Sequence, residues 1–273
     1  MVKTILQVLF GVIVLIWAQW FSTDNLKTEL FGLAIGIGGA ILIEFLYLIY
    51  KQRSFLKLYW ACFKPWAKPE IRLTLAYLYN IEVNGRYLLV KSNRITNTYQ
   101  PVGGVYKYFS PEAKNDLDAM GAITDTKIGN DDTSEFDLRL NLQDRKQLFK
   151  FLKWFFEGDE RENCPWREFY EELIEPNILP ADKFPYIHHQ LVGQHFESIH
   201  WDKFFHVDTF KYVDVFKARF INEGQVNELK RLRTTKSEEY IWVTAEEIKQ
   251  GKSNGYLIAE HTYKIFKTNK IKL

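Results

Sequence analysis

A short charged run in the middle of the chain has the residue types and spacing of a cation site. It extends from Arg167 to Glu172, and Pro165 precedes it at a position typical of the first turn of a helix. On a helix, Glu168, Glu171 and Glu172 stand at i, i+3 and i+4, so their carboxylates share one face. Like charges this close repel one another, and a hard divalent cation with a preference for oxygen ligands, such as Mg²⁺, would relieve the repulsion.

The other face of this helix is apolar and is expected to be buried. It consists of Trp166, Phe169, Tyr170 and Leu173. A string of the form R-E-x-x-E-E is, taken alone, also typical of a solvated acidic helix face. The elements around it must therefore decide between a cation site and an ordinary surface.

Those elements begin with a predicted β-hairpin. Residues 71–83 alternate as a strand, Asn84-Gly85 is a strong hairpin turn signal, and 86–91 return as the partner strand. Gly103-Gly104 follows, where the backbone can turn sharply or approach a ligand. Strands and helices are mixed along the remainder of the chain, which predicts an α+β domain.

Further elements are predicted downstream of the glycine pair. A strand is expected at 136–142 and an aromatic helix near 144–156. A strand beginning at Tyr240 runs into a helix with Thr244 and Glu247 at capping-box spacing, and a closing helix is expected around 258–267.

The N-terminal 50 residues have a different composition. Two apolar runs, 5–21 and 30–50, are long enough to predict a hairpin of two transmembrane helices. The connector at 22–29 is mainly acidic, whereas the segment at 51–70 is basic and aromatic. The positive-inside rule therefore predicts that both termini face the cytoplasm and that 51–70 is a juxtamembrane linker contacting membrane lipid.

Small residues in the second run suggest helix association. Gly32, Gly36 and Ala40 repeat every four residues, a stripe that could pack the hairpin itself or a second copy of the chain. Glu44 is a carboxylate in an apolar run, which could be an oligomer contact, a pore-lining group, or a group near the interface that reaches the headgroups or Lys51.

Overall charge and cysteine content exclude some classes of protein. The formal net charge of +2 does not favour nucleic-acid binding through bulk charge. Two distant cysteines, Cys62 and Cys164, make a disulfide framework improbable and favour a reducing compartment for the soluble part.

In its order of elements the chain resembles the Nudix family, whose box is G-x5-E-x7-R-E-U-x-E-E-x-G-U. Residues 71–104 resemble the opening strands and glycines, Arg167 to Glu172 match the R-E-U-x-E-E core, and 242–248 resemble the penultimate strand and helix. The resemblance implies a Nudix-like mixed-sheet domain at 71–273, split by an insertion at about 105–163. Ile174 replaces the second glycine, and counting the box puts Ser110 or Asp159 at the first glutamate.

The resemblance also implies roles for individual residues. Glu168, Glu171 and Glu172 would be the ligands of a divalent cation, Mg²⁺ in this family. Arg167 would orient a neighbouring carboxylate, and in a hydrolase Arg167 and Glu168 would be the catalytic pair. The glycine pair Gly103-Gly104 would approach the nucleotide.

An inserted Nudix domain behind two membrane helices is similar to the Nudix membrane effectors of bacterial cyclic-oligonucleotide antiphage (CBASS) systems. That similarity implies a nucleotide second messenger made by a cyclase-like nucleotidyltransferase, a homo-oligomer, and disruption of the inner membrane. In it Gly32, Gly36 and Glu44 would take part in membrane assembly. Two alternatives stay open: a membrane-tethered Mg²⁺-dependent Nudix hydrolase of a nucleoside diphosphate derivative, and a scaffold that binds only protein.

Two other groups of residues have side chains that could bind a metal ion or phosphate, but their spacing matches no known motif. Five histidines lie between 188 and 206, at spacings that match no common zinc site. Lys230, Arg231 and Arg233 could meet phosphates or form a solvated helix face.

Overall fold

The computed structural model describes residues 44, 47, 50, 53–125 and 136–266. The chain divides into two compact units, Met1–Ala61 and Cys62–Leu273. Helix α3 (Arg53–Phe63) occupies much of the predicted linker at 51–70 and carries several exposed aromatic side chains.

The predicted membrane hairpin falls almost entirely outside the described residues. Among the helices that the structure does describe, none combines the length and the apolar character needed to cross a bilayer. This finding overturns the predicted inner-membrane localisation with two spans and both termini in the cytoplasm.

The residues expected to act in membrane assembly are affected in the same way. Gly32 and Gly36 lie outside the described residues, whereas Glu44 is an exposed residue in a helix. Assembly through Gly32, Gly36 and Glu44 stays a prediction of the sequence.

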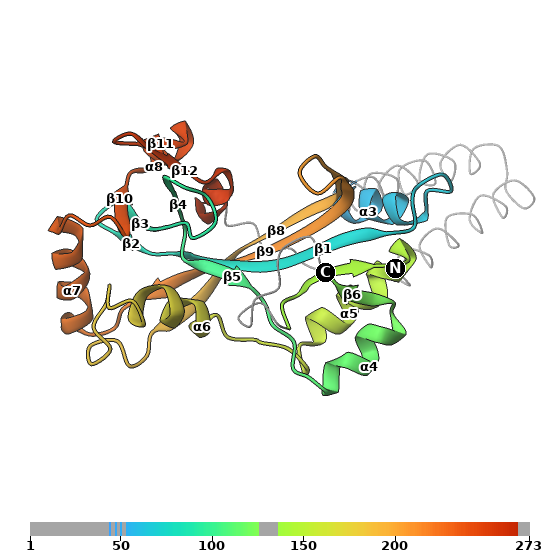
Figure 1. Ribbon diagram of the computed structural model, residues 1–273, viewed down its shortest axis with the longest axis horizontal. Helices are drawn as coiled ribbons and strands as arrows, with labels where there is room; N and C mark the ends of the chain where they lie inside the picture. Colours follow the sequence, from blue (N-terminus) through green and yellow to red (C-terminus); the bar gives the residue numbers. More distant parts are fainter. Residues whose placement is uncertain (1–43, 45–46, 48–49, 51–52, 126–135, 267–273) are drawn as a thin grey trace, which may run out of the picture. The chain divides into compact units, whose positions relative to one another are not determined.

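The second unit is organised around a six-stranded sheet in which β8, β9 and β1 are the long strands (Figure 1). The order is β6-β7-β1-β9-β8, with β5 pairing the same edge of β1 as β7. Strands β1 and β9 are parallel and the other pairs are antiparallel. The strands are β1 (Ile71–Asn80), β5 (Gly103–Val105), β6 (Ala122–Thr124), β7 (Arg139–Leu142), β8 (His188–Asp202) and β9 (Val207–Arg219).

Alternation along β1 assigns its two faces, as the sequence predicts. Leu73, Leu75 and Tyr77 point to one face and are fully buried. Thr74 and Ala76 point to the other face and line a cavity. The central strand therefore supplies the core on one side and the floor of a possible binding site on the other.

A second six-stranded sheet contains the predicted turn at Asn84-Gly85. Asn84 and Gly85 adopt φ of 50° and 73°, which is the left-handed turn backbone favoured by this dipeptide. The turn forms as predicted, but the expected strand at 71–83 is divided, because β1 pairs in the first sheet and only β2 pairs with β3. The order of the second sheet is β10-β3-β4-β12-β11 with β2 pairing β3. Its strands are β2 (Glu82–Val83), β3 (Arg86–Lys91), β4 (Thr98–Gln100), β10 (Tyr240–Val243), β11 (Lys252–Ser253) and β12 (Tyr256–Ile258).

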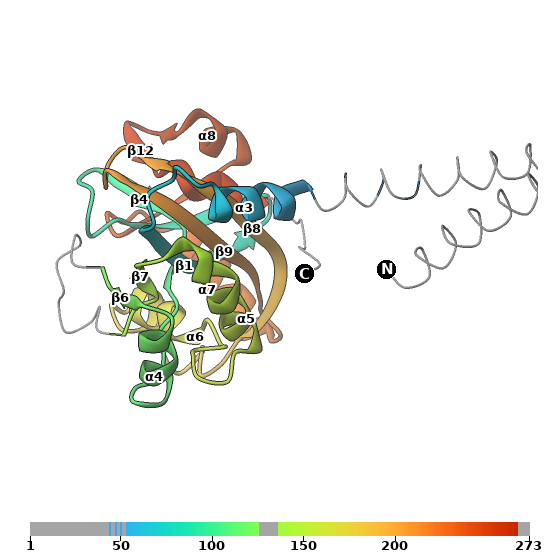
Figure 2. The same ribbon diagram turned by 90° about the vertical axis from the view of Figure 1, so that its right-hand side faces the viewer.

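Helices cover the sheets on both sides, with α5 and α8 on opposite sides of the long strands (Figure 2). The capping box of α8 is formed as predicted, since Thr244 accepts from the Glu247 amide while the Glu247 side chain accepts from the Thr244 amide. The helices are α4 (Glu112–Ala119), η1 (Arg145–Gln147), α5 (Leu148–Glu157), α6 (Trp166–Phe169), η2 (Tyr170–Ile174), α7 (Glu223–Thr234), α8 (Ala245–Gln250) and η3 (Glu260–Phe266). Together the two mixed sheets and these helices confirm the α+β class.

The segment at 105–163 is integrated into this fold. Its helix α5 buries Leu148, Phe151 and Phe155, and its strands β6 and β7 extend the first sheet beside β1. The segment that splits the Nudix-like pattern is thus bonded directly to the strand under the cavity.

Candidate nucleotide-binding site

The glutamate-bearing helix is short and ends in a π-helical turn. Pro165 precedes α6, and the Glu175 amide donates to the Tyr170 carbonyl at 2.9 Å, an i to i+5 bond. Phe169 and Leu173 are fully buried as expected, but Tyr170 is 45% exposed and its predicted burial is wrong. The extra residue in a π-turn widens the helix and rotates later side chains away from ideal α spacing.

Arg167 lies among three carboxylates. Its Nη1 donates to Oε1 of Glu168 at 2.7 Å and to Oε2 of Glu171 at 3.0 Å, and its Nη2 donates to Oε2 of Glu162 at 3.2 Å. A further bond from Nη2 to the Val105 carbonyl, at 2.9 Å, attaches the side chain to β5. Burial acts to lower the pKa of Arg167, but its anionic neighbours hold it above the ordinary value. Arg167 is therefore a fixed cation that orients the glutamates.

Gly103 and Gly104 make room for the helix carboxylates. The Gly103 amide donates to Oε2 of Glu172 at 2.8 Å. A Cβ on Gly104 would lie 1.8 Å from Oε1 of Glu168, so a larger residue cannot fit while that carboxylate stays where it is. The close approach predicted for a ligand at this glycine pair is made in part by the protein's own glutamates.

Burial and mutual repulsion disfavour the charged forms of these glutamates. The pKa of Glu172 is raised to about 8 by burial and by the nearby charge of Glu168, although the Gly103 amide opposes the shift. Burial also raises the pKa of Glu168 in spite of Arg167. The side chain of Glu171 is 45% exposed. Glu168 and Glu172 are therefore the carboxylates whose ionisation a cation would favour most.

The donor set suits a hard cation but is not assembled as a complete metal site. Among the described side chains, no three His, Cys, Asp or Glu residues converge in a way that could hold a metal ion. Buried paired carboxylates with raised pKa values nevertheless match the oxygen chemistry of Mg²⁺. Metal binding by Glu168, Glu171 and Glu172 stays a prediction, with Glu168 and Glu172 the better matched pair.

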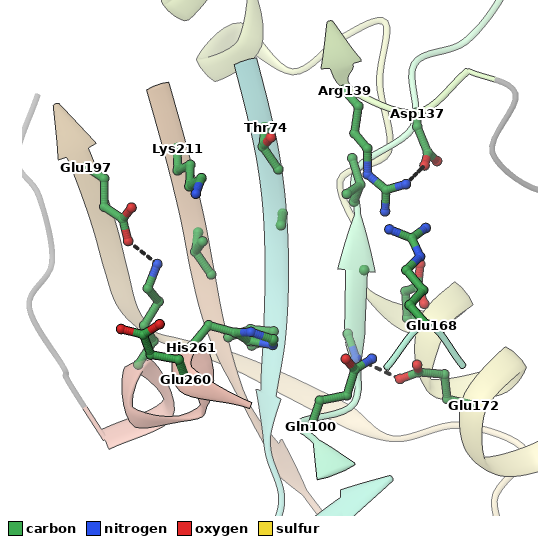
Figure 3. A pocket seen from close by; sticks show the side chains of 18 of the residues that line it. Thr74, Gln100, Asp137, Arg139, Glu168, Glu172, Glu197, Lys211, Glu260 and His261 are labelled. Atoms are coloured by element: carbon green, nitrogen blue, oxygen red, sulfur yellow. Dashed lines mark hydrogen bonds and ion pairs between the residues drawn. The ribbon is translucent and has the colours of Figure 1, made fainter. Parts of the chain in front are cut away.

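These groups border a cavity of about 1050 Å³ above the first sheet. Its floor is the face of β1 that carries Thr74 and Ala76, and Figure 3 shows Glu168 and Glu172 on one wall. Glu197 and Lys211 lie across the floor from them (Figure 3). All of the predicted nucleotide-site residues, namely Gly103, Gly104, Arg167, Glu168, Glu171 and Glu172, line this cavity.

Glu162 is a site residue that counting along the motif missed. Its carboxylate binds Arg167 and is 12% exposed, while counting the box had pointed to Asp159 or Ser110. Burial raises the pKa of Glu162, although Arg167 opposes the shift. The sequence signal that could have found it is an acid five residues before Arg167, at an irregular distance because a loop separates α5 from α6.

The histidine-rich segment forms no common site. His200 lines the cavity, whereas His195 bonds the Lys264 carbonyl and His189 lies between Tyr79 and Cys164. Arg231, on α7, is bonded to Glu228, and none of the three basic residues at 230–233 lines the cavity. Of the two predictions for these residues, a helix face outside the cavity therefore agrees with their position, and phosphate contact in the cavity does not.

The chain is similar to a solved bifunctional NMN adenylyltransferase/ADP ribose pyrophosphatase from Francisella tularensis, at 12% identity and a TM-score of 0.28. That match covers 88% of this chain and spans about half, 50%, of the other one. None of the curated proteins matches. The model of a family described as the SMODS-associated NUDIX domain matches residues 70–266, which is most of the chain. The chain therefore belongs to the SMODS-associated NUDIX domain family, a Nudix-type protein of an SMODS-linked antiviral-defence context.

Proposed function

We propose that the domain senses a nucleotide signal by binding it in the cavity above β1, as the effector of an SMODS-linked defence system. The observation that carries the proposal is the meeting of Gly103, Gly104, Glu168 and Glu172 at one wall of a cavity of about 1050 Å³. Ligand sites in proteins commonly enclose about 300–1000 Å³, so this space suits a ligand larger than a single small metabolite. A cyclic oligonucleotide is the signal that we favour.

The charges around the cavity fit a phosphate ligand carried with a cation. Glu168 and Glu172 would hold Mg²⁺, which when bound would neutralise phosphate charge and stabilise these carboxylates in their ionised form. Arg167 would keep Glu168 oriented through the bond at 2.7 Å. Cation and ligand would then bind cooperatively, because each lowers the electrostatic cost of binding the other.

Sensing is favoured over turnover by the state of the third glutamate. Glu171 is half-exposed and bonded to Arg167, and Ile174 stands where the family box has glycine. Phosphoryl chemistry depends on precise positioning of the cation and the attacking water, whereas binding tolerates looser geometry. The retained R-E-x-x-E-E helix supports the second candidate, an Mg²⁺-dependent hydrolase of a nucleoside diphosphate derivative.

One experiment separates the two candidates. The full chain is titrated calorimetrically, with Mg²⁺ present, with cyclic di- and trinucleotides of adenine, guanine and uracil and with ADP-ribose, and each mixture is then assayed for breakdown by chromatography. A sensor binds one of the cyclic ligands and leaves it intact. Mg²⁺-dependent cleavage of ADP-ribose would favour the hydrolase, and failure to bind any of these ligands would refute both.

The step after capture is also a proposal. A ligand that prefers an assembled form shifts the population towards that form by its differential affinity alone. We expect the cyclic ligand to promote a homo-oligomer, measured as an increase in mass by light scattering. A nucleotidyltransferase encoded nearby would be the expected source of the signal. Membrane disruption is not part of this proposal, because the localisation it required is overturned.

A further inference from the structure

The basic side chains that line the cavity differ in how they are paired. Six of the described arginine and lysine side chains line the cavity, namely Arg72, Arg94, Arg139, Arg167, Lys211 and Lys264. Four of them are engaged at short range, since Arg72 binds Asp125 at 2.5 Å, Lys211 binds Asp202 at 2.8 Å, Lys264 binds Glu197, and Arg167 binds its glutamates. Their charge is therefore largely balanced within the protein.

Arg94 is the exception among these described residues. It is exposed, lies in the loop between β3 and β4, and has no carboxylate partner in the part of the chain that the structure describes. The loop itself is held in shape, because the Arg94 and Ile95 amides both donate to the Ser92 hydroxyl at 3.3 Å. Arg94 thus presents a positive charge at the cavity from a defined backbone, with no carboxylate partner among the described residues.

Arg139 adds to this charge from the segment that splits the motif. Its guanidinium lies 3.3 Å from Asp137, but the same carboxylate is shared with Lys107 at 3.5 Å. Burial lowers the pKa of Arg139, and the positive charge of Arg94 lowers it further, although Asp137 opposes the shift.

The register between β7 and β1 places Arg139 on the face of the sheet that borders the cavity. Arg139 stands directly opposite Thr74 in the antiparallel pair of β7 and β1, and opposed residues project to the same face of a sheet. Thr74 is on the cavity floor, so Arg139 projects to the same side. Figure 3 shows Arg139 and Asp137 on the side of the cavity where Glu168 lies.

The spacing to the glutamate wall suits a phosphate bound next to a cation. Gly104 is opposite Tyr77, three residues along β1 from Thr74. At a rise of about 3.3 Å per residue, the backbone positions of Arg139 and Gly104 are about 10 Å apart along the strand. The side chains of Arg139 and Glu168 both line the cavity over this interval.

We propose that Arg94 and Arg139 form an anion subsite that receives a phosphate group of the ligand, opposite the cation held by the glutamates. The proposal rests on the proposed function for the rest of the cavity. Guanidinium groups bind phosphate oxygens through paired, charge-assisted hydrogen bonds. The segment at 105–163 then contributes directly to ligand binding, since β7 supplies one half of the clamp.

The test uses the full chain with Mg²⁺ and inorganic pyrophosphate as the probe in calorimetric titrations. Arg94→Gln and Arg139→Gln are each compared with Lys114→Gln, a matched loss of one positive charge on exposed α4 that does not line the cavity. Loss of a charge-assisted contact of about 1.5–3 kcal/mol corresponds to about 10- to 150-fold weaker binding for the two arginine variants. Lys114→Gln should bind as the wild type does.

Arg94→Gln provides the safer arm, because Arg94 is exposed and its side chain stabilises no other described residue by an ion pair. Unchanged pyrophosphate affinity in Arg94→Gln and in a folded Arg139→Gln overturns the subsite while nucleotide binding through the glutamate wall still stands. No pyrophosphate binding to wild type also overturns the subsite. If cyclic nucleotides and ADP-ribose fail to bind wild type as well, the proposed function fails with it.

Discussion

Replacing Gly104 by alanine tests the glutamate wall directly. The new Cβ would lie 1.8 Å from Oε1 of Glu168 and 2.2 Å from its Cδ, whereas ordinary contact begins at 3.4 Å. The carboxylate must therefore retreat by about 1.6 Å, the difference between 3.4 and 1.8 Å. Oε1 is also the atom that accepts from Arg167 at 2.7 Å, so the retreat breaks or stretches a charge-assisted bond worth about 1.5–3 kcal/mol.

The expected result is a loss of cation affinity in a folded protein. Displacing a ligand or its support commonly weakens metal binding by about 10- to 100-fold. Mn²⁺, titrated into the full chain and followed by electron paramagnetic resonance, provides a direct readout of the free ion. Urea denaturation in parallel should show that Gly104→Ala remains folded, with its free energy of unfolding lower by about 1–3 kcal/mol.

Gly224→Ala is the matched control. It adds the same methyl group to a glycine outside the cavity lining, where the nearest atom, Oδ1 of Asn222, would be 3.3 Å away. Mn²⁺ affinity should then be unchanged. Equal Mn²⁺ affinities for Gly104→Ala and wild type would refute the view that Glu168 faces the cation.

Three other predictions concern pH, packing and thiol chemistry. The pKa of Glu172 is about 8 in the folded chain against an ordinary 4.5, so its contribution to stability is complete below pH 4.5 and is lost as the pH rises through 8. Urea denaturation between pH 5 and 9 should show a decline on the order of a few kcal/mol. The decline should be smaller in Glu172→Gln, where Glu162 and Glu168, whose pKa values are also raised, still titrate, and an equal decline in both proteins would contradict it. Arg161→Gln removes a buried guanidinium that donates to two backbone carbonyls and stacks on two aromatic rings. The free energy of unfolding should fall by about 2–4 kcal/mol in urea denaturation, and a fall of less than about 0.5 kcal/mol would exclude a stabilising role for Arg161. Cys164 is exposed whereas Cys62 is buried with a pKa raised to about 12, so maleimide should label one thiol per native chain and two in denaturant; two labelled thiols in the native chain would show that Cys62 is accessible.

Features encoded by neighbouring residues could be predicted from the sequence. The turn at Asn84-Gly85 depends on two residues that tolerate a positive φ, and the helix start at Thr244 depends on a reciprocal bond with Glu247 three residues later. Both features formed as expected. The physical reason is that each requires no information beyond a few adjacent positions.

Features that depend on distant pairing could not be predicted in the same way. The parallel pairing of β1 with β9 joins Arg72 to Thr209, and the antiparallel pairing with β7 joins Thr74 to Arg139. Alternating hydrophobicity reports that a strand has a buried face, but it does not name the neighbouring strand. Arg139 therefore escaped the sequence-based set of site residues, although its strand had been expected.

The segment from Glu162 to Glu172 contains residues whose position could be predicted from the sequence and residues whose position could not. The family pattern singled out Glu168 and Glu172, and both line the same cavity as Gly104. Counting failed for Glu162, because the connection from α5 to α6 is irregular, and α periodicity failed for Tyr170, because the helix changes to a π-turn there. Fixed spacing is informative only while the backbone keeps one regular geometry.

The bonding of β1 on both edges determines how the cavity can adapt. Strand β9 covers one edge and β7 with β5 cover the other, so opening this floor would require breaking several ladders at once. Amide hydrogens along β1 should consequently exchange with solvent only through global unfolding. A bound ligand should slow this exchange, because it raises the free energy of unfolding by the free energy of binding. In the proposed nucleotide sensor, selectivity would then arise from the side chains and connecting segments above the strand, while the floor keeps a single shape.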